Sequence, residues 1–280
     1  MHITYIYTPL LAALIVFLAS LQSYAVNVLV SPPEVVPGDV FLLKITSADN
    51  APVEATFLDR KVDLYPSEGG LISLIPLDVN TNPGKHKIHV RHGGALSTAS
   101  VKVKSHTFRT IKLTLPEEKV TLSPEDQKRV DKEYGLQQDI WGKNTKPVWD
   151  GQFAAPLDTE ISTEFGVRRI MNEKKTSVHR GMDFRGKTGI PVKALNAGKV
   201  VLSQDLFYGG NTLIVDHGMG LYSVYMHLSK FNVNDDSKVE KGQIVGFVGS
   251  SGRATGPHLH LSVKLNGVSV NPESLFKLDL

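Results

Sequence analysis

Short runs of hydrophobic residues, several alternating with polar ones, are separated by turn signals from Val26 to about Lys104. The expected strands include residues 40–45, 87–91 and 99–104. Alternation with a period of two is typical of a strand that buries one face. Strands that recur about every ten residues between Pro-Gly and Gly-Asp turns favour a small sandwich. We therefore predict a mainly β chain that begins with an immunoglobulin-like β-sandwich over residues 26–105.

A helix is predicted to begin at Ser123, which is a good N-cap followed by Pro124 and two acidic residues. It should run through Val130 and Tyr134, and Gly135 could interrupt or end it. A polar stretch at 142–151 follows, so residues 106–150 read as a linker that contains a helix. Beyond Phe153 the strand pattern returns with many glycines, which indicates a second β domain over residues 151–280.

The first 25 residues carry a different pattern. Residues 3–21 are uncharged, their densest apolar part is 10–18, and Ser23-Tyr24-Ala25 places small residues before a possible cut. This pattern favours a signal peptide over residues 1–25, cleaved after Ala25, and export to the periplasm or cell envelope. A retained anchor is the other interpretation. No second apolar run of this length follows, so we expect no stable membrane span after cleavage.

The composition excludes several classes of binding site and catalytic site. The 31 basic and 28 acidic residues give a net charge of +3, far from the excess expected of a nucleic-acid-binding protein. The chain has no cysteine, which excludes disulfides, a thiolate nucleophile and a thiolate metal site. Any metal must therefore bind histidine and carboxylate. In the first domain Lys85, Lys87, His89 and Arg91 share one strand face, which a solvated surface explains better than a polyanion-binding site.

Five of the ten histidines lie in the second β domain. His258 and His260 are two residues apart, so a strand would point both to the same side. His179 and Asp183 are four apart in a second segment. Catalytic zinc usually has three protein ligands and one open position, and two histidines with one aspartate satisfy that requirement. Each pair is weak alone, but their combination with His227 in one glycine-rich domain indicates a metal site.

Residues from about 153 to 276 resemble the lysostaphin-type zinc metallopeptidases, the LytM or M23 family of peptidoglycan endopeptidases. The similar stretches, in family order, are residues 165–169, 179–184, 189–194, 197–200, 210–218, 222–228, 239–243, 246–252, 255–260 and 271–272. The resemblance implies a largely antiparallel sheet with a groove, a bound Zn²⁺ ion, and hydrolysis of peptide cross-links rather than glycan strands. Its substrate would be the stem peptides of peptidoglycan.

The resemblance also implies the role of each residue. His179, Asp183 and His260 would be the metal ligands, and His227 and His258 would be catalytic residues beside the metal. Asp216 and His217 would be structural. The expected bond joins D-alanine to diaminopimelate, while a polyglycine bridge or carboxypeptidase action on uncrosslinked stems stays open, as does the oligomeric state.

Three other interpretations compete with an active peptidase. Some relatives have lost their metal ligands and act as catalytically silent activators of a cell-wall amidase, but the corresponding positions are intact here. A biotinyl or lipoyl carrier would need a lysine at a hairpin tip, where this chain has Asp216-His217-Gly218. A purely structural exported protein gives no reason for the combined motifs.

The first domain and the helix could position the enzyme or cover its groove. Covering predicts autoinhibition, so that a chain starting near Asp150 would cleave wall material faster.

Overall fold

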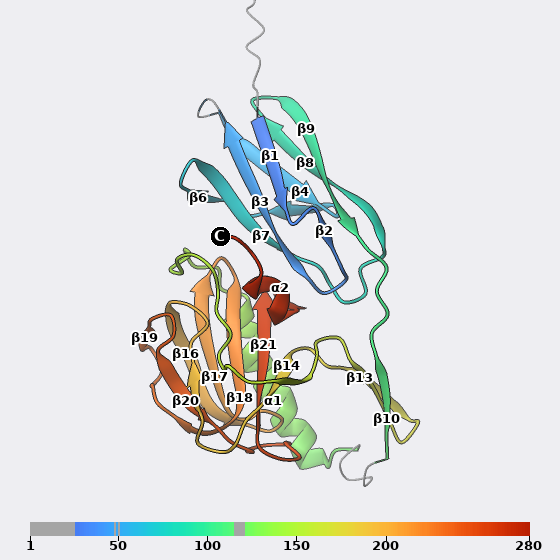
Figure 1. Ribbon diagram of the computed structural model, residues 1–280, viewed down its shortest axis with the longest axis vertical. Coiled ribbons are helices and arrows are strands. Elements are labelled where there is room, and N and C mark those ends of the chain that lie inside the picture. The colour runs from blue at the N-terminus through green and yellow to red at the C-terminus, as the bar shows by residue number, and fades with distance from the viewer. Residues whose placement is uncertain (1–25, 48, 50, 115–120) are drawn as a thin grey trace, which may run out of the picture.

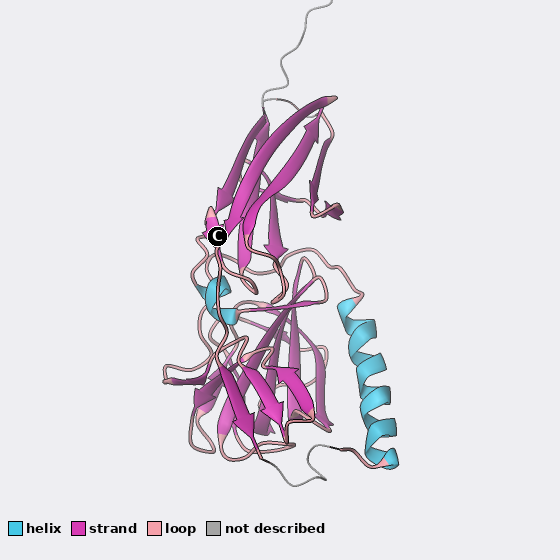
Figure 2. Ribbon diagram, turned by 90° about the vertical axis from the view of Figure 1, so that its right-hand side faces the viewer, coloured by secondary structure: helices cyan, strands magenta, loops and turns pink. Residues whose placement is uncertain are grey.

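The computed structural model describes residues 26–47, 49, 51–114 and 121–280. Two β-rich units are stacked along the long axis of the molecule, and helix α1 (Pro124–Trp141) runs beside the C-terminal unit (Figures 1 and 2). The expected signal peptide, residues 1–25, lies outside the described residues. Within the part of the chain that the structure describes, no helix is long and apolar enough to cross a membrane.

The N-terminal unit is a sandwich of two sheets, as predicted. One sheet has the order β1 (Val26–Ser31), β3 (Val40–Ser47), β7 (Gly70–Pro76) and β6 (Tyr65–Ser67). The other has the order β2 (Glu34–Val35), β9 (Ala95–Val103), β8 (Gly84–His92), β4 (Val53–Phe57) and β5 (Arg60–Val62). The alternation is visible on β8, where Ile88 and Val90 are fully buried while Lys87 and His89 are exposed. The inward-facing side chains of both sheets form one core.

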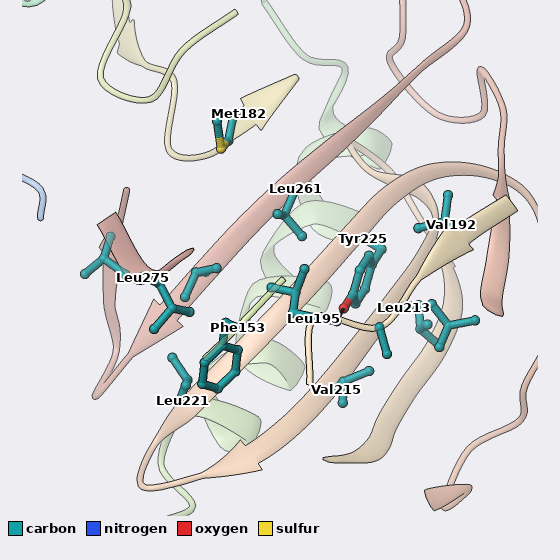
Figure 3. Close-up of a cluster of buried hydrophobic side chains, with 14 of the residues drawn as sticks. Phe153, Met182, Val192, Leu195, Leu213, Val215, Leu221, Tyr225, Leu261 and Leu275 are labelled. Carbon is teal, nitrogen blue, oxygen red and sulfur yellow. Dashed lines mark hydrogen bonds between the residues drawn. The ribbon is translucent and has the colours of Figure 1, made fainter. Parts of the chain in front are cut away.

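The C-terminal unit is built on a ten-stranded, largely antiparallel sheet. Its main path is β11 (Ile161–Thr163), β14 (Met182–Arg185), β21 (His258–Leu265), β18 (Leu221–Phe231), β17 (Gly210–Gly218), β16 (Gly198–Leu206) and β19 (Lys238–Val239). Three further strands join it, β15 (Pro191–Lys193), β20 (Ile244–Val248) and β22 (Val268–Val270), and α2 (Pro272–Phe276) follows. Leu213, Tyr225 and Leu261 pack into a core on one face of this sheet, and α1 lies behind the other face (Figure 3).

Helix α1 begins as predicted but does not end at Gly135. The Ser123 side chain accepts a hydrogen bond from the Asp126 N–H, and the helix continues to Trp141. A glycine inside a helix costs about 1 kcal/mol relative to alanine. The residues beyond it offset that cost, because Ile140 is buried in a second cluster with Ile214 and Tyr222 of the sheet. Sequence periodicity alone does not show this long-range packing.

The segment 106–150, expected to be a linker with a helix, also contains a strand. Residues of β10 (Thr110–Leu113) pair in parallel with β12 (Arg168–Met171), which forms a hairpin with β13 (Lys175–Val178). The two units also contact each other directly. The Asn271 N–H donates to the Gly38 carbonyl at 2.7 Å, and the Val40 N–H donates to the Ser274 hydroxyl at 3.0 Å. The sandwich is therefore in direct contact with the C-terminal unit and is not joined to it by the linker alone.

Candidate metal centre

Three side chains that are far apart in the sequence meet at the junction of β14 and β21. These strands are antiparallel neighbours, and their register places Asp183 directly opposite His260. His179 lies just before β14, and its N–H and carbonyl bond to Val167 and Gly166 beside the β12–β13 hairpin. Within the described residues, His179, Asp183 and His260 form the one histidine and carboxylate cluster that could hold a metal ion.

The facing atoms of this cluster are close together. His179 Nε2 lies 3.1 Å from Asp183 Oδ1 and 3.0 Å from His260 Nδ1, and His260 Nδ1 lies 2.7 Å from Asp183 Oδ1. His179 and Asp183 are buried, and His260 is partly buried. Ligands of a tetrahedral zinc ion are about 3.3 Å apart, because each lies about 2.0–2.1 Å from the metal. The three atoms thus stand near the spacing that a zinc ion requires.

Outer hydrogen bonds fix which ring nitrogens face the centre. His179 Nδ1 donates to the Glu164 carbonyl at 2.9 Å, which leaves the Nε2 lone pair facing inward. The Ser262 hydroxyl donates to the Arg180 carbonyl at 2.8 Å, so its oxygen accepts from His260 Nε2 at 3.0 Å and leaves Nδ1 as an acceptor. Two lone pairs and a carboxylate oxygen therefore converge. This donor set fits a divalent cation, and the outer bonds orient it as is usual around metal ligands.

The electrostatics of the cluster agree with a bound cation. Burial alone would raise the pKa of Asp183, but positive charge and hydrogen bonds from the His179 and His260 rings, if protonated, outweigh it and hold that pKa well below its usual range. With both rings neutral, a bound cation supplies positive charge at the same place. Burial lowers the pKa of His260, which favours the neutral ring that binds metal. The guanidinium of Arg169 also approaches, with Nη2 3.6 Å from Asp183 Oδ2.

His227 and His258 lie beside the cluster, as expected of residues that flank the metal. Their ring centroids are 4.7 Å apart, and His258 Nε2 is 3.9 Å from Asp183 Oδ1. His227 Nδ1 donates to the Ser251 carbonyl at 2.9 Å, and His258 Nδ1 donates to the Gly256 carbonyl at 2.8 Å. Each ring thus carries its proton on Nδ1 and has its lone pair on Nε2. Burial lowers the pKa of His227 to about 4.

The remaining histidine of this half lies elsewhere. His217 is fully buried, with Nδ1 2.7 Å from the Ala197 carbonyl and Nε2 2.8 Å from the Ser223 hydroxyl. Asp216 accepts bonds from the Gly218 N–H and the Thr145 hydroxyl and takes no part in the cluster. Both residues hold the end of β17, which is the structural arrangement expected of them.

Sequence reasoning did not find two residues that contact the cluster. Ser262 follows His260 by two positions on β21, so the same period of two that paired the histidines could have indicated it. Arg169 has no such signal, because it approaches Asp183 only through the folding of the β12–β13 hairpin.

An open pocket adjoins the cluster. Its volume is about 640 Å³, and Asp183 and His258 line it together with hydroxyl and basic side chains that include Ser162, Thr163, Arg185 and Lys187. A pocket that opens to solvent and ends at a cluster that could hold a metal ion can admit part of an extended substrate.

The sequence around these residues is similar to that of known peptidases. Residues 177–272, which include all five candidate site residues, match peptidase family M23. The chain is 38% identical over 117 residues to DD-carboxypeptidase/endopeptidase Mpg of Neisseria meningitidis serogroup B, covering 42% of this chain and 27% of that protein. It is 39% identical over 119 residues to peptidoglycan DD-endopeptidase ShyA of Vibrio cholerae, covering 41% of this chain and 28% of that protein.

A solved structure is similar over nearly the whole length. The crystal structure of a peptidase M23 protein from Pseudomonas aeruginosa is 30% identical, covers 88% of this chain and 95% of its own, and has a TM-score of 0.65. The likeness therefore includes the N-terminal sandwich. By contrast, the chain spans about a quarter of the length of the curated relatives and resembles them over less than half of its own residues.

Proposed function

The chain belongs to peptidase family M23, and from this premise we propose that it is a zinc-dependent peptidase that hydrolyses peptide cross-links of peptidoglycan. The observation that carries the proposal is the convergence of three acceptor atoms, His179 Nε2, Asp183 Oδ1 and His260 Nδ1. The hydrogen bonds of His179 to the Glu164 carbonyl and of His260 to the Ser262 hydroxyl fix the tautomers of the two histidines. We propose these residues as the metal ligands and residues 151–280 as the peptidase domain, with residues 26–105 as the sandwich and 106–150 as the connecting segment.

When bound, zinc supplies Lewis acidity and lowers the pKa of water towards neutrality. The residues of the chain supply the orientation and the proton transfer. Asp183 on β14 and His260 on β21 are positioned by the pairing of these strands, and His179 is positioned by its backbone hydrogen bonds to Gly166 and Val167. Arg169 adds positive charge on the outer oxygen of Asp183.

His227 and His258 are the proposed catalytic residues. Each donates its Nδ1–H to a backbone carbonyl, so each directs Nε2 as the atom that exchanges a proton or binds an oxygen of the substrate. Burial holds the pKa of His227 at about 4, so its ring is neutral near pH 7 and can accept a proton. The ring centroid of His258 lies 4.7 Å from that of His227, and His258 would donate from Nε2 to the oxygen on which charge develops once that nitrogen has taken up a proton.

The proposed bond joins D-alanine to diaminopimelate. Two relatives support it, because their names describe DD-endopeptidase activity on peptidoglycan or a combined DD-carboxypeptidase and endopeptidase.

We also propose that the protein is exported to the periplasm or cell envelope and that residues 1–25 are its cleaved signal peptide. The support is the sequence pattern of those residues and the location of the substrate.

The test combines metal content with cleavage of purified sacculi by the protein comprising residues 26–280. One zinc per chain, with loss of cross-linked muropeptide dimers and gain of monomers, is the expected result. Zinc binding without release of monomers would contradict the endopeptidase proposal. A protein with neither zinc nor cleavage would instead favour the silent amidase activator, which a binding assay with a cell-wall amidase would then identify.

A further inference from the structure

The open pocket beside the metal centre is rich in positive charge. Arg185 and Lys187 both line it, and they follow the proposed ligand Asp183 by two and four residues. Asp183 is the one acidic residue among the described residues that line the pocket, and its oxygens face His179, His260 and Arg169. The pocket therefore presents cations whose charge its own lining does not neutralise.

The two basic residues differ in how they are paired. Arg185 Nε lies 3.0 Å from Glu160 Oε2 in an exposed ion pair, which is of the kind that contributes little stability and exchanges readily. Lys187 is exposed and has no ion-pair partner among the described residues. Lys187 is thus the cation of the pocket that is available to a ligand.

Hydroxyl groups complete the lining. Thr159, Ser162, Thr163 and Thr255 contribute to the same pocket, and there is open space at Gly256, where a Cβ would meet nothing within 4 Å. A lysine beside several hydroxyl donors is a suitable environment for a carboxylate, because hydrogen bonds to an ionised acceptor are roughly twice as strong as neutral ones.

We propose that this pocket binds a substrate carboxylate close to the scissile amide, with Lys187 as its principal partner. The inference rests on the proposed function and specifies which cross-link that function selects. In a D-alanyl–diaminopimelate cross-link, the amide nitrogen is attached to a carbon that carries a free carboxylate. In a glycine bridge the corresponding carbon carries none. Lys187 is therefore a specificity-determining residue that favours the first cross-link over the second.

The experiment compares two synthetic cross-linked peptides with the zinc-loaded protein of residues 26–280. One peptide has a free carboxylate on the carbon that bears the scissile nitrogen, and the other has a carboxamide there. We expect the wild-type kcat/KM to be about tenfold higher for the carboxylate peptide. Lys187→Gln should remove that preference mainly through KM, and Lys187→Arg should keep most of it. Lys128→Gln, which makes the same charge change at an exposed position of α1, should have no effect.

The outcomes separate this inference from the proposed function. Equal cleavage of both peptides by the wild type, unchanged in Lys187→Gln, would overturn the carboxylate pocket while leaving the peptidase intact. Failure to cleave either peptide would overturn the proposed function. In that case calorimetric binding of the same two peptides decides the inference, which requires tighter binding of the carboxylate form and its loss in Lys187→Gln.

Discussion

The carboxylate of Glu133 on α1 accepts a hydrogen bond from the backbone N–H of Phe207 at 2.8 Å. Phe207 lies in the turn between β16 and β17, and the Gly209 carbonyl of the same turn accepts the His227 N–H at 2.7 Å. Arg129 reinforces the contact, because it pairs with Glu133 at 2.7 Å and with Asp205 at 3.1 Å. Helix α1 thus contacts the turn whose Gly209 carbonyl accepts the backbone N–H of a proposed catalytic residue, His227.

This relationship predicts that Glu133→Ala lowers activity although Glu133 lies far from the metal ligands in sequence. Loss of the acceptor would release the Phe207 turn and misplace His227, and small misplacements of a catalytic group are costly. We expect kcat to fall about tenfold with KM and zinc content little changed. Steady-state kinetics on a cross-linked peptide and metal analysis measure these quantities.

Glu133→Gln is the matched control, because its amide oxygen still accepts the Phe207 N–H while the ion pair with Arg129 is lost. It should retain most of the activity. If Glu133→Ala and Glu133→Gln lost the same activity, the ion pair rather than the backbone contact would be responsible. Full activity in both variants would rule out a positioning role for Glu133.

Deletion of everything before Asp150 tests what the helix and the sandwich do. Helix α1 covers Ile214, Tyr222 and Val224, and the Tyr222 hydroxyl donates to the Ile140 carbonyl at 2.9 Å. The truncated chain would expose these side chains, so we expect a lower melting temperature and slower cleavage than for residues 26–280.

Autoinhibition predicts the opposite result of that truncation. Among the described residues, those that line the pocket beside the metal centre all lie between 159 and 258, so the sandwich contributes none of them. Faster release of muropeptides by the truncated chain, measured at equal zinc content, would show that the N-terminal segments cover the groove.

Substitutions in and beside the cluster test the proposed ligands separately from the proposed catalytic residues. His260→Ala and Asp183→Ala should lose zinc, because each removes one of three converging acceptors. His227→Ala should keep one zinc per chain and lose about 10²- to 10⁴-fold in kcat, the usual contribution of a proton-transferring side chain. Metal analysis beside kinetics checks both. Stoichiometric zinc in an inactive His260→Ala protein would remove His260 from the ligand set.

Local patterns predicted the parts of this site that depend on strand geometry. The period of two paired His258 with His260, and the N-cap at Ser123 placed the start of α1. Long-range packing decided the rest. Gly135 lies inside α1 because Ile140 packs on the sheet beyond it, and β10 forms because the linker passes beside the β12–β13 hairpin. Neither the contact of Arg169 with Asp183 nor that of Glu133 with Phe207 has a signal in the local sequence.

His217 provides a prediction for stability rather than activity. Burial lowers its pKa to about 4, against about 6.5 for an exposed histidine. The unfolded chain therefore binds a proton at this residue between these two pH values, while the folded protein does not. The corresponding stability is fully present above about pH 6.5 and is lost as the pH falls towards 4. Between pH 7.5 and 5.0 the loss should be about 2 kcal/mol.

The measurement compares His217→Gln with the wild type, both free of metal, by urea unfolding at pH 7.5 and pH 5.0. Glutamine keeps polar contacts in the buried space but cannot be protonated, so the variant should be less stable at pH 7.5. Its deficit should shrink by about 2 kcal/mol at pH 5.0, because only the wild type loses the contribution of the neutral ring. Other titrating groups are common to both proteins and cancel in the difference. An equal deficit at the two pH values would show that His217 takes up its proton in the folded protein as readily as in the unfolded chain.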